Sequence, residues 1–157
     1  MGIDNRLLTS LEHNLGPVIM SALRDPDVVE IMLNPDGKIW IEKLGHEMEA
    51  VSDMATEQAR LVLSLVASGL DTVITPEQPI IEGELPLDGS RFEGLLPPIV
   101  SAPSFTIRKK ASRVFGLEEY VRAGIMDAVL VPAFRDALTS RINILVVGGT
   151  GSGKTTL

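Results

Sequence analysis

One short segment near the end of the sequence combines glycines, a lysine and threonines at a spacing that suits phosphate binding. Residues 148–155 read GGTGSGKT and match the pattern G-x-x-x-x-G-K-[ST] at every position. In such a loop, successive backbone N–H groups curve around phosphate oxygens, because glycine has no side chain to block them and adopts positive φ angles. Lys154, the predicted catalytic lysine, is expected to lie along the β- and γ-phosphates, and Thr155 to give its hydroxyl to Mg²⁺. The predicted nucleotide-binding residues of the loop are Gly148, Gly149, Thr150, Gly151, Ser152, Gly153, Lys154, Thr155 and Thr156.

The residues around this loop predict the elements that must hold it. A run at 142–147, apolar except for Asn143, predicts a buried strand that leads into the loop. A helix that begins near Gly153 would point the positive end of its dipole at the phosphates. That helix has about one turn of sequence before Leu157, whereas an isolated helix needs roughly 12–15 residues to be even marginally stable. We therefore expect this chain alone to bind nucleotide weakly and not to turn it over. A glycine-rich turn without a ligand is the alternative.

The first 110 residues predict an α+β domain, in which helices cover a small, mostly antiparallel sheet. Apolar residues recur at helical spacing after Asp4, with a break at Gly16-Pro17 and a second helix through Leu23. Two β-prone runs joined by Pro-Asp-Gly predict a hairpin, and Asp88-Gly89 predicts a turn between two later strands. The expected strands are 28–34, 38–43, 48–51, 80–85, 91–96 and 104–110, and a further helix is expected at 56–69.

The remaining part of the chain has a different pattern. Residues 115–141 predict a helix, a turn and a second helix, with Gly116 and Gly124 as the breaks. We place a domain linker at 111–116. It divides the chain into an N-terminal domain at 1–110 and the start of a second domain at 117–157, which ends in the phosphate-binding loop.

The composition argues against several classes of protein. The chain has 157 residues, of which 45% are hydrophobic, so it can bury a core. Its net charge of −7 disfavours direct nucleic-acid binding, which needs an excess of positive charge. The absence of cysteine excludes disulfides and thiolate metal sites. No stretch approaches the roughly 18 apolar residues of a membrane span, and no signal core is seen, so we expect a cytosolic chain.

Four stretches of the sequence, taken together, resemble one family. They are DVVEIMLNPDGKIWIEK, LPLDGSRFEGLLPPIVSAPSFTIRKK, FGLEEYVRAGIM and NILVVGGTGSGKTTL, and they follow the family's order over nearly the whole chain. The sequence is similar to the N-terminal part, up to and including the P-loop, of Trb-type conjugative transfer ATPases, which belong to the type II and type IV secretion ATPase superfamily. The P-loop alone would indicate only an NTPase, and the middle stretches narrow the resemblance.

The resemblance implies a two-domain ATPase with the nucleotide between its domains. An N-terminal α+β domain would precede an α/β RecA-like motor domain, with ATP and Mg²⁺ as cofactors and six subunits in a ring. Two arginines of the N-terminal domain would reach the phosphates, namely Arg91 after the Asp-Gly-Ser turn and Arg108 at the end of FTIR. We predict both as catalytic residues, because a guanidinium is a planar fork that suits phosphate. Lys109 is included as a further nucleotide contact.

The family also implies a location and a set of partners. Its members would work in the cytoplasm, peripheral to the inner membrane, together with proteins of the secretion or conjugation apparatus, and no direct nucleic-acid binding is expected. The family's Walker B acidic residue, catalytic glutamate and histidine box do not occur before Leu157, so we expect a fragment of a longer ATPase. Two alternatives stay open. One is a type II secretion or type IV pilus ATPase, and the other is a ring or interaction module that binds nucleotide without hydrolysis.

Other polar residues predict no site of their own. Glu82 and Glu84 alternate along an expected strand and are interpreted as charges on a strand face. His13 and His46 have no partner at metal-ligand spacing and are expected on the surface. Glu118 and Glu119 are expected to favour a helix N-terminus electrostatically.

Overall fold

The computed structural model describes residues 5–110 and 116–149. The chain divides into two compact units, Met1–Ser112 and Arg113–Leu157. None of the helices in the described ranges is long and apolar enough to cross a membrane.

The first helix, α1 (Asn5–Arg24), is bent at the position where the sequence predicts a break. Gly16 has a φ of 77° and a ψ of 170°, and Pro17, which has no N–H to donate, follows it directly. The two halves share one apolar stripe, whose buried members are Leu11, Leu15, Ile19 and Ala22. The predicted break and second helical segment are therefore confirmed, whereas the expected cap at Asp4 lies outside the described residues.

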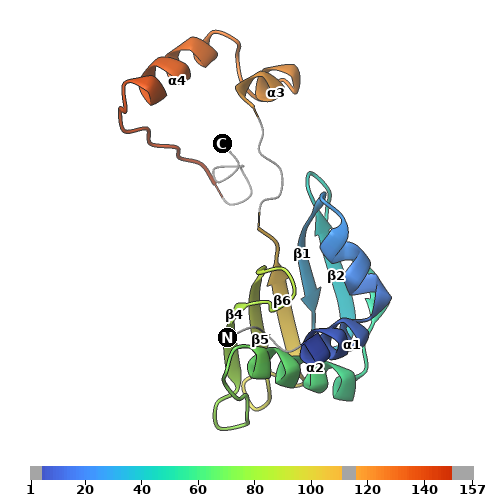
Figure 1. Cartoon of the computed structure of the whole chain (residues 1–157). Helices are drawn as coiled ribbons and strands as arrows, with labels where there is room; N and C mark the ends of the chain where they lie inside the picture. The colour runs from blue at the N-terminus through green and yellow to red at the C-terminus, as the bar shows by residue number, and fades with distance from the viewer. Residues whose placement is uncertain (1–4, 111–115, 150–157) are drawn as a thin grey trace. The chain divides into compact units, whose positions relative to one another are not determined.

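Six strands form one antiparallel sheet in the order β3-β2-β1-β6-β5-β4 (Figure 1). The strands are β1 (Val28–Leu33), β2 (Lys38–Lys43), β3 (Glu49–Asp53), β4 (Ile80–Glu84), β5 (Arg91–Leu95) and β6 (Ser104–Arg108). β1 and β2 form the predicted hairpin, in which the Gly37 N–H donates to the Asn34 carbonyl at 2.9 Å. All six predicted strands are confirmed, with ends that differ from the expected bounds by up to two residues. β3 runs from Glu49 to Asp53, and β6 ends at Arg108 instead of Lys110.

One face of the sheet is covered by α1 and by the second helix, α2 (Thr56–Gly69) (Figure 1). Alternate strand residues point into the core beneath these helices, and Phe92 and Ile107, which are paired in register, are both 0% exposed. Gly94 allows α2 to approach closely, because a Cβ at this position would lie 2.3 Å from Leu63 Cδ2. The other face of the sheet carries neither of these two helices, and its side chains on β5 and β6 include the candidate arginines.

The second unit contains two described helices, α3 (Leu117–Arg122) and α4 (Leu130–Thr139), as the helix-turn-helix pattern predicts. The Glu119 carboxylate accepts a hydrogen bond from the Gly116 N–H at 3.1 Å, so the acidic first turn closes the start of α3 as expected. No residue of α4 is buried.

The strand predicted at 142–147 is not formed, and this prediction is wrong for the described residues. The segment has no assigned strand, and Leu145 and Val147 are 86% and 79% exposed. A strand needs a neighbour to pair its N–H and C=O groups, and none of the described strands pairs with this run. The apolar composition of the run favours a strand, but composition alone does not supply the partner.

Candidate anion-binding site

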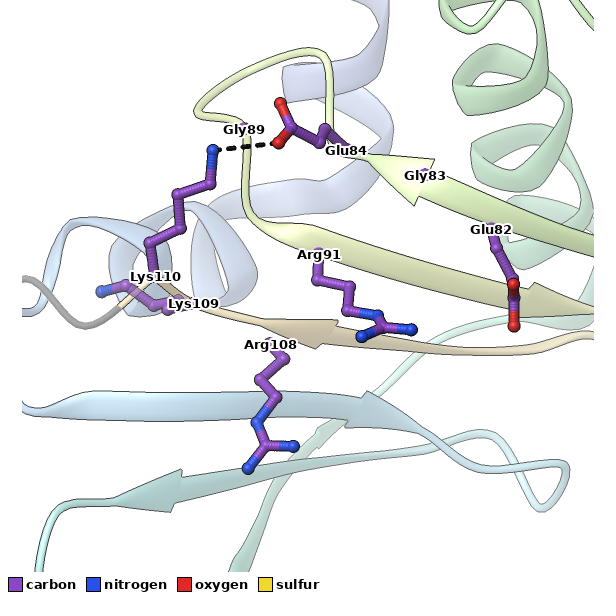
Figure 2. Close-up of a pocket in the computed structure, with 8 residues that line it drawn as sticks. All are labelled: Glu82, Gly83, Glu84, Gly89, Arg91, Arg108, Lys109 and Lys110. Carbon is purple, nitrogen blue, oxygen red and sulfur yellow. Dashed lines mark hydrogen bonds and ion pairs between the residues drawn. The ribbon is translucent and has the colours of Figure 1, made fainter. Parts of the chain in front are cut away.

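Arg91 and Arg108 stand directly opposite each other on adjacent strands. Arg91 opens β5, Arg108 ends β6, and the antiparallel register pairs the two positions. Their sequence neighbours Phe92 and Ile107 face the core, so both arginines lie on the sheet face that points away from the helices (Figure 2). Two residues that are 17 positions apart in the sequence are thus brought together.

Neither guanidinium has a protein partner in the part of the chain that the structure describes. The ion pairs and side-chain hydrogen bonds of the described residues include none made by Arg91 or Arg108. Two like charges directly opposite each other on a sheet repel and destabilise the pairing. An anion between them would replace that repulsion by attraction, and a phosphate group matches the forked geometry of each guanidinium.

The two arginines line an open depression with a volume of about 480 Å³ (Figure 2). The residues around it are Glu82, Gly83, Glu84, Gly89, Arg91, Arg108, Lys109 and Lys110. Three of its cations, Arg91, Arg108 and Lys110, lie near Glu82 and Glu84, and Glu30 is paired with Arg108 in the register of β1 and β6. The unpaired guanidinium groups, and not an excess of positive charge, are therefore what could bind an anion here. Glu82 and Glu84 are exposed on β4, which confirms their interpretation as strand-face charges.

A tight turn fixes the position at which Arg91 leaves the sheet. Gly89 has a φ of 71°, and Ser90 after it is buried. The Asp88 carboxylate accepts two hydrogen bonds from Ser90: Oδ1 accepts from the N–H at 2.9 Å, and Oδ2 accepts from the hydroxyl at 2.8 Å. The Leu85 N–H then donates to the Ser90 carbonyl at 2.7 Å and closes the hairpin between β4 and β5. The sequence predicted the Asp-Gly turn. The role of Ser90 was not predicted, although an Asp two residues before a Ser is a recognisable side-chain turn signal.

Lys109 lies on the opposite side of the sheet from Arg108 and contacts the end of α1. Its ammonium donates to the carbonyl oxygens of Ala22, at 3.3 Å, and Asp25, at 2.5 Å. Carbonyls at this end of a helix lack partners within the helix and form the negative end of its dipole. Burial lowers the pKa of the Lys109 ammonium, against the opposing effect of the Asp25 carboxylate. Lys109 therefore stabilises the contact between α1 and the end of β6. The predicted contact of Lys109 with nucleotide stays a prediction.

Replacing Lys109 with methionine is expected to lower the free energy of unfolding by about 1–3 kcal/mol, because helix carbonyls lose a charged donor. Lys110→Met is the matched control, since it makes the same change at the next residue. The Lys110 side chain is 65% exposed, and its loss is expected to change stability by at most about 0.5 kcal/mol. Urea denaturation of both variants measures the difference. Equal losses would contradict the structural role of Lys109.

Most of the predicted P-loop lies outside the described residues. Gly148 and Gly149 are described and exposed, whereas Lys154 and Thr155 fall within 150–157 and are not described. Among the residues of 5–110 and 116–149, no group of three or more His, Cys, Asp or Glu side chains could hold a metal ion. His13 and His46 are exposed, as predicted. The nucleotide and Mg²⁺ contacts of the loop stay predictions.

Comparison with known proteins relates this domain to bacterial transfer and secretion systems. No family model matches the chain. It is 52% identical over 152 residues to the probable conjugal transfer protein TrbB of Sinorhizobium fredii and 52% identical over 152 residues to the conjugal transfer protein TrbB of Rhizobium radiobacter. Both alignments cover 97% of this chain and 47% of the relative. The type IV secretion system protein VirB11 of Bartonella henselae is 28% identical over 187 residues, which cover 96% of this chain and 51% of that relative.

A solved structure shows a likeness to the same group of proteins. The VirB11 ATPase from the Brucella suis type IV secretion system, in complex with sulphate, matches with a TM-score of 0.64 and 26% identity, over 98% of this chain and 53% of that one. The chain is therefore similar in sequence and in fold to members of the type IV secretion ATPase superfamily. Within it, the 52% identical relatives are TrbB conjugal transfer proteins. The chain spans about half the length of these curated relatives.

The likeness confirms the predicted α+β fold of helices over an antiparallel sheet. The predicted start of an α/β RecA-like domain stays a prediction, because the described part of the second unit contains two helices and no strand.

Proposed function

We propose that this chain is part of an ATP-hydrolysing motor of conjugative transfer, and that Arg91 and Arg108 bind the phosphates of its nucleotide. One observation carries the proposal: two exposed arginines lie directly opposite each other, without a protein partner in the described chain, in an open depression. The sulphate complex of the Brucella suis relative supports anion binding in the family, because sulphate is a tetrahedral anion like phosphate.

The depression fits the polyphosphate part of ATP. Its two guanidinium groups offer several N–H donors on an open face, where a ligand meets no covering helix of the first unit. In this proposal Arg91 and Arg108 neutralise charge on the terminal phosphates. The P-loop, with Lys154, supplies backbone N–H groups and a second cation, and Thr155 gives its hydroxyl to Mg²⁺. The bound Mg²⁺ would supply further neutralisation of phosphate charge.

The proposed organisation follows the predicted domain limits. An N-terminal domain at 1–110 is followed by a linker at 111–116 and by the start of a motor domain at 117–157. The division of the chain into two units after residue 112 supports these limits. We further propose a hexamer that works in the cytoplasm at the inner membrane, with proteins of the conjugation or secretion apparatus as its partners. The names of the 52% identical relatives favour conjugative transfer over type II secretion.

The test is ATP hydrolysis by a protein that carries this sequence and extends to the full length of the TrbB relatives. Lys154→Ala is expected to abolish turnover, because it removes the cation along the β- and γ-phosphates. The 157-residue chain itself is expected to show no turnover and weak ATP binding. Parental hydrolysis rates in the Lys154→Ala variant would contradict the proposed function.

A further inference from the structure

An ion pair lies at the rim of the arginine site and joins two strands that are not neighbours. The Lys110 ammonium, just beyond β6, is 3.1 Å from Glu84 Oε1 at the end of β4 (Figure 2). Because β5 lies between β6 and β4, the pair reaches across the turn that leads into β5. Gly89 leaves room for it, since a Cβ there would lie 3.0 Å from Lys110 Nζ.

In this ion pair, Lys110 binds the Glu84 carboxylate, which is also the nearest candidate partner of Arg91 in the sheet. Glu84 and Arg91 are directly opposite in the register of β4 and β5. Opposite charges in directly opposed positions of a sheet attract each other. The ion pairs of the described residues nevertheless do not include one between Glu84 and Arg91. Figure 2 shows the Glu84 carboxylate turned towards Lys110, while the Arg91 guanidinium extends away from both.

Stability does not explain the arrangement. The side chains of Lys110 and Glu84 are 65% and 72% exposed, and an ion pair this exposed contributes little to folding. The ion pair between Lys110 and Glu84 instead affects the binding of an anion at Arg91. If Glu84 paired with Arg91, that pair would have to break before an anion could bind. The apparent affinity would then be the intrinsic affinity multiplied by the fraction of molecules in which Arg91 is free.

We propose that Lys110 is a positioning residue, which holds the Glu84 carboxylate and thereby keeps Arg91 free to bind a phosphate group. The proposal rests on the proposed function of the arginine site as a polyphosphate site. Lys110 acts through Glu84, and its effect on anion binding therefore depends on the presence of the Glu84 charge.

A double-mutant cycle on the 157-residue chain tests this, with inorganic tripolyphosphate as the probe. The four proteins are the parent, Lys110→Met, Glu84→Gln and the variant with both changes. Lys110→Met is expected to weaken tripolyphosphate binding roughly two- to fivefold when Glu84 is present, because Arg91 then pairs with the carboxylate. In the Glu84→Gln background the same change is expected to have a clearly smaller effect, because only the loss of the Lys110 charge then acts on the anion. The thermal midpoint of each variant confirms that it folds.

A second readout needs no anion. The ¹⁵N resonance of Arg91 Nε is expected to move in Lys110→Met relative to the parent, and to stay unchanged when Lys110→Met is added to Glu84→Gln. An equal loss of affinity in both backgrounds would show that Lys110 acts on the anion directly, and an unmoved Arg91 resonance would show that Glu84 does not turn to it. Either result would overturn the role of Lys110. A parent chain that binds no tripolyphosphate would instead contradict the proposed function.

Discussion

Replacing both Arg91 and Arg108 with alanine is expected to lower the affinity for tripolyphosphate by about 100-fold or more. Each guanidinium contributes charge-assisted hydrogen bonds worth roughly 1.5–3 kcal/mol, and about 1.4 kcal/mol corresponds to a tenfold change in affinity. The stability of the folded state should not decrease. Both side chains are exposed, and removing two opposed like charges relieves repulsion across β5 and β6. The thermal midpoint should therefore stay at the parental value or rise.

The control for this variant is Arg24→Ala with Arg60→Ala, which removes the same charge from two exposed positions on α1 and α2. A ³¹P NMR titration of tripolyphosphate measures affinity in all three proteins. Affinity that falls by the same factor in the control would mean that net charge, and not the arginine pair, binds the anion. A drop of the thermal midpoint confined to the Arg91 and Arg108 variant would mean that these side chains serve the fold.

Replacing Phe92 with alanine is expected to lower the free energy of unfolding by about 3–5 kcal/mol, because the change leaves a cavity in the core. Phe92 is 0% exposed and stacks on Phe105, with ring centroids 5.7 Å apart. It also lies next to Arg91, so it anchors the strand from which that arginine leaves. Glu93→Ala is the matched control, because Glu93 follows on the same strand and is exposed, and its loss should cost about 0.5 kcal/mol or less.

Guanidinium denaturation of the two variants measures these losses. A loss below about 1 kcal/mol for Phe92→Ala would show that the core of the first unit is less tightly packed than the structure indicates. The same experiment separates the two faces of β5, since one face holds the core and the other presents the candidate site.

Local sequence signals predicted most of the first unit. The Pro-Asp-Gly turn of the hairpin, the helical stripe of α2 and the break at Gly16 each depend on residues within a few positions of one another. Strand pairing is not local, and the pairing of β1 with β6 therefore could not be read from the sequence. The strand predicted at 142–147 failed for the same reason, because a β-prone run forms a strand only beside a partner.

The site was predicted in part by resemblance and in part by chemistry. Arg91 and Arg108 were named as a pair because their motifs match the family, while their direct opposition follows from the register of β5 and β6. The location of Lys109 on the sheet face opposite to Arg108 could have been predicted from the sequence. Strand residues alternate between faces, so a residue next to Arg108 must point the other way. The ion pair of Lys110 with Glu84 depends on the turn at Gly89, and no spacing in the sequence reveals it.

The most direct test of the arginine site is a ¹⁵N NMR titration of the arginine Nε resonances in the parent chain with tripolyphosphate. We predict that the resonances of Arg91 and Arg108 shift together and saturate along one binding curve, while that of Arg60 on α2 does not move. Shifts of similar size at all exposed arginines, or no shift at Arg91 and Arg108, would contradict the existence of a phosphate site between these two strands.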